Sequence, residues 1–157
     1  MRVRPVLPLL LSLLALAACA PSLPDRPPAP RGPERRVVLA VPRFDHFPPY
    51  ELVAPEAAAP DLDSHPRARE YRTRLREGAA KGPAFAGHLA VASWACGQGC
   101  RQWAFVDARD GRVVWGPRTG PTAEFRRDSR LFVADPKDRA RTRYYVWTGT
   151  ALREMEG

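Results

Sequence analysis

The sequence predicts an α+β domain in which one main helix packs on a small antiparallel β-meander of about five to seven strands. A helical spacing of apolar residues occurs within residues 66–79. From residue 87 onward, apolar residues alternate with polar ones at a period of two, which is typical of strands. Short turns with glycine and aspartate separate these strands, so neighbours in the chain should pair antiparallel. A signal helix and a disordered linker are expected before the domain.

Residues 1–18 have the features of a secretory signal peptide. Arg2 and Arg4 supply positive charge, residues 6–16 form an apolar run, and small residues follow that run. The run is too short to cross a bilayer, which takes about 20 residues. We therefore expect residues 1–18 to be removed on secretion.

The signal ends in Leu16-Ala17-Ala18-Cys19, which resembles the Leu-small-small-Cys lipobox of bacterial lipoproteins. In that family the cysteine thiol takes a diacylglyceryl group, the signal is cut just before the cysteine, and the new amino group is usually acylated. The resemblance implies a lipid at Cys19, whose acyl chains would hold the protein firmly on a membrane. In Gram-negative lipoproteins a residue other than aspartate after the cysteine, here Ala20, implies the outer membrane, inner leaflet, facing the periplasm. An ordinary signal with a chance cysteine is the alternative.

The chain from Cys19 onward is expected to divide into a tether and one domain. Residues 19–36 are dominated by proline and charge, and such a segment cannot bury a core. Residues 37–157 are expected to form a single globular α+β domain with one modest core. Within it, residues 37–41 are predicted to be a short strand, and residues 42–66 mostly loop.

The chain is strongly basic, with a formal net charge of +8, of which two charges lie in the signal and +6 in the rest. One interpretation is a negatively charged partner, such as a phospholipid headgroup, lipopolysaccharide or acidic glycan. The other is a coding bias toward Ala, Arg, Pro and Gly, with the charge serving solubility. We expect the membrane, an anionic envelope component or a protein as partners, and no nucleic acid.

The predicted helix has one face rich in arginine. Asp63 or Ser64 can cap its start, and Pro66 suits the first turn, where no N–H is needed. Its apolar stripe comprises Ala68, Tyr71, Leu75 and Ala79. The opposite face carries the candidate anion-binding residues Arg67, Arg69, Arg72, Arg74 and Arg76, with Glu70 placed to pair with Arg74. A merely solvated face is the alternative interpretation.

The strands are predicted at residues 88–95, 103–106, 113–115, 130–135, 141–147 and 151–155. In the first of them, one face should carry Leu89 and Val91, and the other face should carry Ala90, Ala92 and Trp94. Residues 107–111 are predicted to be a hairpin turn, and residues 116–121 to break the sheet.

Cys96 and Cys100 form an even pair once Cys19 is assigned to lipid, and the periplasm is oxidising. They flank Gly97-Gln98-Gly99, where two glycines allow a tight reversal of the chain. A disulfide that joins two strand ends is therefore expected. The alternatives are a redox-active pair, which normally has two residues between its cysteines, and a metal site with His88 as third ligand. We expect no metal and no cofactor.

A second resemblance is carried by Gly82-Pro83-Ala84-Phe85-Ala86-Gly87-His88, Trp94-Ala95-Cys96-Gly97 and Asp107-Ala108-Arg109-Asp110-Gly111. These stretches are similar to a family of uncharacterised secreted bacterial proteins, whose signature reads roughly NFAGHY, WGCG, a further C and DaktG. This sequence departs at Ala84, Leu89 and Ala95, where the signature has Asn, Tyr and Gly. The resemblance implies one domain, a signal peptide and the cysteine pair, and it carries no catalytic residue.

Three functions remain open. The leading hypothesis is a non-enzymatic, membrane-anchored periplasmic domain that binds an envelope component or a protein partner. The second is a periplasmic hydrolase or transferase with His88 as base, although no recognisable catalytic set accompanies it. The third is an inhibitor of a cell-wall hydrolase, whose loop at residues 96–100 inserts into the target. The four tryptophans either line a groove for sugar or peptide or fill the core: Trp94, Trp103, Trp115 and Trp147.

Overall fold

The structure, a computed structural model, describes residues 41–53 and 56–156. The predicted signal peptide, Cys19 and the tether lie outside the described residues, as does most of the strand predicted at residues 37–41. Of that predicted strand only Val41 is described, and it is exposed and outside any strand. The described residues belong to one compact unit, Val38–Gly157.

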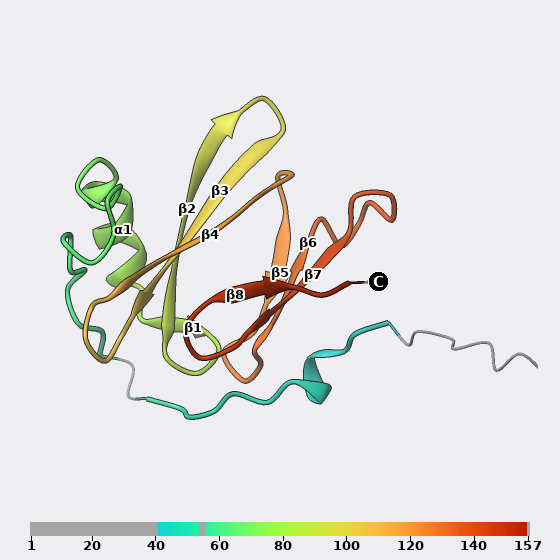
Figure 1. The fold of residues 1–157 in the computed structure, drawn as a ribbon, viewed down its shortest axis with the longest axis horizontal. Helices are drawn as coiled ribbons and strands as arrows, with labels where there is room; N and C mark the ends of the chain where they lie inside the picture. The colour runs from blue at the N-terminus through green and yellow to red at the C-terminus, as the bar shows by residue number, and fades with distance from the viewer. Residues whose placement is uncertain (1–40, 54–55, 157) are drawn as a thin grey trace, which may run out of the picture. The chain divides into compact units, whose positions relative to one another are not determined.

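Eight strands of the described chain form two four-stranded antiparallel sheets (Figure 1). The first sheet contains, in spatial order, β1 (Pro83–Phe85), β2 (Leu89–Gly97), β3 (Cys100–Asp107) and β4 (Val113–Thr119). The second contains β5 (Ala123–Phe125), β6 (Leu131–Ala134), β7 (Arg143–Trp147) and β8 (Leu152–Glu154). Each strand pairs with its neighbour in the chain, so each sheet is a meander.

The α+β class and the antiparallel meander are as predicted, but the strands number eight and divide between two sheets instead of forming one. The predicted break at residues 116–121 begins too early, because β4 runs on through Thr119. Pro117 is tolerated there because β4 is an edge strand, where one N–H is not needed for pairing. The chain changes sheets only between Thr119 and Ala123, at Gly120 and Pro121.

Helix α1 (Arg72–Ala79) is shorter than predicted, since the residues before it form turns. The predicted caps are wrong: Tyr71 precedes the helix and makes no side-chain capping bond. Ser64 is bonded to the first sheet instead, because its Oγ accepts a hydrogen bond of 2.9 Å from the N–H of Val113 in β4. A short 3-10 helix, η1 (Phe44–His46), lies earlier in the chain. No helix among the described residues is long and apolar enough to cross a membrane.

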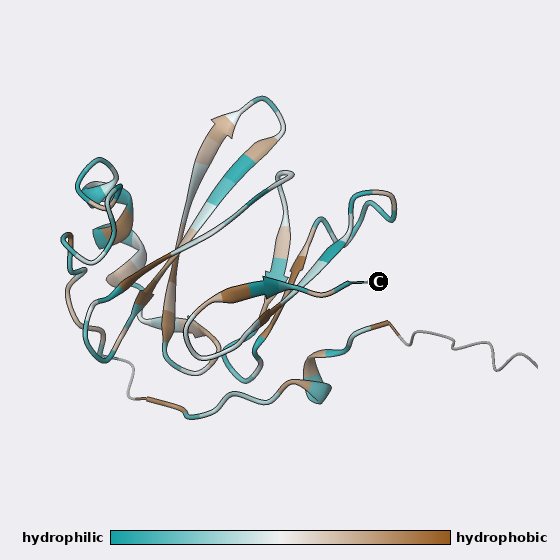
Figure 2. Cartoon of the chain, in the orientation of Figure 1, coloured by the Kyte–Doolittle hydropathy of each residue, from teal (hydrophilic) through white to brown (hydrophobic). Residues whose placement is uncertain are grey.

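Each face of the first sheet contributes to a hydrophobic core, because α1 packs on one face and the second sheet on the other. The helix-side core comprises Ala68, Leu75, Ala79, Ala90, Ala92, Trp94, Ala104, Val106 and Val113. The inter-sheet core comprises Phe85, Ala86, Leu89, Trp103, Phe105, Phe132, Ala134 and Trp147. The alternation predicted for β2 is therefore confirmed. Figure 2 shows hydrophobic residues along the strands and mostly hydrophilic residues in the loops.

A segment that we call the strap, residues 44–53 and 56–61, is bound to turns of both sheets. Ser129, before β6, donates its hydroxyl to the carbonyls of Phe44 and Phe47, at 2.8 and 3.0 Å. The N–H groups of Val53, Ala58 and Asp61 bond to the carbonyls of Gly87, Ala108 and Gly111. At Gly87, where φ is +85°, a Cβ would lie 1.7 Å from a strap carbonyl oxygen, so only glycine fits.

Candidate functional site

A polar pocket of about 390 Å³ opens where the ends of the two sheets meet. The end of β4, the segment after β6, strands β7 and β8, and Gly99 of the β2–β3 loop line it. Three arginines and two acidic residues dominate its side chains, together with one tyrosine: Arg118, Arg141, Arg143, Asp135, Glu154 and Tyr145. Two other pockets of the described chain have fewer arginines, with one and two in their linings.

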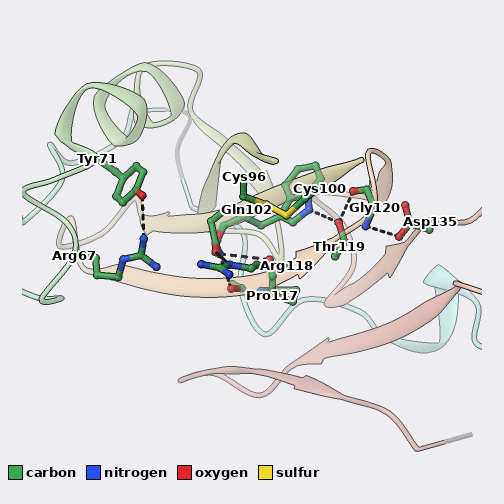
Figure 3. The surroundings of a disulfide bond; sticks show 12 residues. Arg67, Tyr71, Cys96, Cys100, Gln102, Pro117, Arg118, Thr119, Gly120 and Asp135 are labelled. Atoms are coloured by element: carbon green, nitrogen blue, oxygen red, sulfur yellow. Dashed lines mark hydrogen bonds between the residues drawn. A yellow bond between two sulfur atoms is a disulfide. The ribbon is translucent and has the colours of Figure 1, made fainter. Parts of the chain in front are cut away.

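Asp135 fixes the floor of this pocket. It is 6% exposed, and its φ of +49° is unusual for a residue with a side chain. Its carboxylate accepts the N–H groups of Gly120 at 2.7 Å and Thr122 at 3.4 Å. A Cβ at position 120 would lie 2.4 Å from Oδ1 of Asp135, so the close approach requires glycine. Asp135 thus joins the exit of the first sheet to the second, as the labelled residues in Figure 3 show.

The charges around the pocket are unevenly balanced. Arg143 Nε lies 3.5 Å from an oxygen of Glu154, so these two side chains offset each other. Arg118 donates only its Nε, to Gln102 at 3.3 Å, and Arg141 Nε lies 3.9 Å from Asp138. Within the described residues, the terminal nitrogens of Arg118 and Arg141 donate no hydrogen bond.

Tyr145 lies in the pocket wall between these charges. Burial raises the pKa of its phenol above the usual value, and the carboxylate of Glu154 raises it further. Tyr145 therefore stays a neutral hydrogen-bonding group at ordinary pH.

The predicted disulfide between Cys96 and Cys100 is present, with the two Cα atoms 5.1 Å apart (Figure 3). It closes the exposed loop between β2 and β3, next to the residues that form the pocket. Its sulfurs are bonded to each other, so they are not free to ligate a metal. The group considered as a third ligand, His88, lies at the other end of β2.

His88 is buried, with only 2% of its surface exposed. Its Nε2 lies 3.9 Å from Oδ2 of Asp107, which is too far for a hydrogen bond, and neither ring nitrogen has a partner among the described residues. Burial lowers the pKa of His88 below its ordinary value, and the Asp107 carboxylate opposes this only in part. The imidazole is therefore neutral and enclosed beside Trp147, which gives a substrate no route to it.

Asp107, also fully buried, is a structural carboxylate. Arg109 binds both of its oxygens, with Nε at 2.9 Å and Nη2 at 2.6 Å, and Arg109 also pairs with Glu51 of the strap. Burial alone would raise the pKa of Asp107, but the bonds from Arg109 prevail and the pKa is lowered. The carboxylate thus holds Arg109, which links the turn to the strap, and it is not free to act as a partner for His88.

The arginines predicted to form one stripe have separate partners. Arg67 lies over aromatic rings, 5.1 Å from the centroid of Tyr71 and 4.8 Å from that of Trp115, and donates to the Tyr71 hydroxyl at 2.9 Å. Arg69 pairs with Asp63. Arg74 pairs with Glu77 at 3.2 Å, whereas Glu70 pairs with Arg67. Arg72 bonds to a carbonyl in the preceding turn. Anion binding by this face, Arg76 included, stays a prediction.

The tryptophans mainly fill the cores. Trp147 and Trp103 belong to the inter-sheet core, and Trp94 to the helix-side core. Trp115 is partly exposed, and its ring stacks on that of His65 with centroids 4.8 Å apart. No groove lined by the four rings together is formed, because they face two different cores.

The pocket was not predicted from the sequence. Its residues come from four separate strands and three loops, and only the packing of two sheets brings them together. Comparison of the chain with models of protein families, with curated proteins and with solved structures found no match. What can be said of its function therefore comes from its own residues.

Proposed function

We propose that this protein is a lipid-anchored, non-enzymatic binding domain of the bacterial cell envelope, facing the periplasm. The observation that carries the proposal is the lipobox, Leu16-Ala17-Ala18-Cys19, at the end of a charged and then apolar N-terminal segment. Several acyl chains on one cysteine give firm membrane attachment, where one chain gives only marginal attachment. The bonded pair Cys96–Cys100 supports an oxidising compartment, because structural disulfides are rare in the cytosol.

The binding role is supported by how the titratable residues are used. His88 is enclosed, and Asp107 is bound by Arg109. Both observations argue against acid–base catalysis at the one histidine considered for it. The basic pocket between the sheets instead offers donor groups to a ligand. The alternative of a cell-wall hydrolase inhibitor acting through the β2–β3 loop stays a prediction, supported only by the exposure of residues 95–99.

Replacing the lipid-bearing cysteine tests the anchor. In cells that process lipoproteins, Cys19→Ala should move the full-length protein from the membrane fraction to the soluble fraction, and incorporation of labelled palmitate should be lost. The matched control is Cys96→Ser with Cys100→Ser, which removes the other two cysteines and should leave the protein in the membrane fraction. Membrane fractionation and labelling unchanged by Cys19→Ala would refute the proposal.

A further inference from the structure

We propose that the pocket between the two sheets binds a phosphate group, held by Arg118 and Arg141 with the remaining donors of Arg143. This inference rests on the proposed binding function and names its ligand class. The three guanidinium groups come from β4, β7 and the loop before β7, and all line one cavity of about 390 Å³. A cavity of that size accommodates a small polar molecule or a lipid headgroup.

The charge of the pocket favours an anion. Glu154 is offset by Arg143, and the Asp135 carboxylate is turned to two backbone N–H groups and almost wholly shielded from solvent. The guanidinium groups of Arg118 and Arg141 are exposed, and each uses only its Nε with the described residues. Their outer N–H pairs are thus available to an incoming ligand, while each of the two carboxylates that line the pocket already has a partner.

The number of donors favours phosphate over carboxylate. A guanidinium presents its N–H groups in a planar fork that matches two oxygens of either anion. A carboxylate has two oxygens, which one guanidinium satisfies, whereas a phosphate has enough oxygens for two or three. Tyr145, kept neutral by burial and by Glu154, lines the same cavity.

The pocket is also held in shape before any ligand arrives. Asp135 fixes the Gly120–Thr122 backbone, and the side chain of Thr119 accepts the indole N–H of Trp103 at 2.8 Å. The Cys96–Cys100 disulfide constrains the loop that contains Gly99. The backbone around the pocket then loses little conformational freedom when a ligand binds, which favours affinity for a small ligand.

Titration of the purified full-length protein in a non-ionic detergent tests this inference. The probes are inorganic phosphate and glycerol 3-phosphate, added at constant ionic strength with chloride as the compensating ion and followed by calorimetry. We expect saturable binding at about millimolar concentration or tighter. Arg141→Gln and Arg118→Gln should each weaken binding about tenfold, since each removes charge-assisted hydrogen bonds. Arg141 is exposed in a loop, so its variant should fold normally.

The matched control is Arg153→Gln, which removes the same charge from β8 at the residue next to Glu154 but outside the pocket lining. It should leave binding unchanged. The inference is overturned if neither probe binds saturably, or if Arg153→Gln weakens binding as much as Arg141→Gln, since general charge would then explain the affinity.

A competition arm identifies the source of the phosphate. Micelles that contain phosphatidylglycerol, compared with micelles that contain diacylglycerol, should displace glycerol 3-phosphate if the natural ligand is a lipid headgroup, and should not if it is a free phosphate ester. Failure of phosphate binding leaves the Cys19→Ala fractionation result untouched. Conversely, a protein that binds phosphate but is not membrane-bound would refute the anchor and leave the pocket in place.

Discussion

His88 and Asp107 are buried next to each other and respond to burial in opposite ways. Asp107 keeps its charge, because Arg109 binds both carboxylate oxygens. His88 has no such partner, so the neutral form of its imidazole is favoured in the folded protein. An uncharged histidine in this position packs beside Trp147 as an aromatic side chain does. Burying His88 in the neutral form costs stability at low pH, because the unfolded chain then binds a proton at this residue and the folded chain does not.

The stability of the protein should therefore fall as the pH drops below 6.5. The folded-state pKa of His88 lies below its ordinary value of 6.5, so below that pH the unfolded state binds more protons. The contribution of neutral His88 to stability is fully present above pH 6.5 and is lost as the pH falls toward the folded-state pKa. Urea denaturation between about pH 7.5 and pH 5 measures this, clear of most carboxylate titration. His88→Phe should flatten the dependence, and the exposed-histidine control His46→Gln should not. An equally steep dependence in His88→Phe would contradict the assignment.

At the scale of elements, the contact between α1 and β2 depends on small residues. Gly78 lies on the buried side of the helix, and Ala92 faces it from the strand. A Cβ built at position 78 would lie 2.7 Å from the Ala92 Cβ and 2.9 Å from the Val91 carbonyl oxygen. The helix therefore packs against the strand more closely than any side chain at this position allows.

Gly78→Ala should destabilise the protein, even though alanine favours the helix by about 1 kcal/mol. The clash is with backbone atoms, and overpacking of this kind costs about 1–3 kcal/mol, so we expect a net loss of about 1 kcal/mol. The midpoint of urea unfolding at unchanged m-value measures it. Arg76→Ala, on the exposed side of the same helix, should change stability by less than about 0.5 kcal/mol. A stabilised Gly78→Ala variant would show that α1 can move away from β2.

At the scale of the whole molecule, the first sheet contributes to both cores. Its strands supply mostly small residues, together with Trp94, to the helix-side core, and mostly large residues to the inter-sheet core. Phe132 of the second sheet lies at the centre of the aromatic group, with its ring centroid 5.3 Å from that of Trp103 and 5.9 Å from that of Phe105. Because one sheet is common to both cores, loss of either core should expose the other.

Phe132→Ala should cost about 3–5 kcal/mol, the usual range for removing a buried phenylalanine. Unfolding followed by tryptophan fluorescence and by far-ultraviolet circular dichroism should give one coincident transition, both in the parent and in the variant. Tyr144→Ala, on the partly exposed face of β7, should cost less. Two separate transitions would mean that the sheets unfold independently.

Most strands could be predicted from the sequence, because side chains at alternate positions of a strand lie on the same face. Alternation of residue types therefore indicates which residues share a buried face. The assignment of faces in β2 was correct for that reason. Alternation does not say which sheet a strand joins, so the division into two sheets was not foreseen. The helix start was misplaced because Ser64 looks like a cap but bonds to the sheet, and a bond between residues so far apart leaves no local signal.

The candidate site was less accessible from the sequence. The disulfide could be predicted, since assigning Cys19 to lipid leaves one cysteine pair, and the two glycines between its members allow a tight reversal. Arg118 and Arg141 gave no signal, because arginines at strand ends and in loops are ordinary in a basic chain. The arginines that did stand out, around α1, are largely occupied by Asp63, Glu77 and aromatic rings.

The strap has a mechanical consequence. Any force applied through the N-terminal part of the chain reaches the domain first at Phe44 and Phe47, whose carbonyls are held by Ser129. Next along the strap, Glu51 is clamped by Arg109, and the backbone is bonded at Gly87 and Ala108. The force would load these bonds one after another along the strap, before it loads the hydrogen bonds between the strands of either sheet. Under such a force, the strap is therefore expected to detach from the domain before the two sheets unfold.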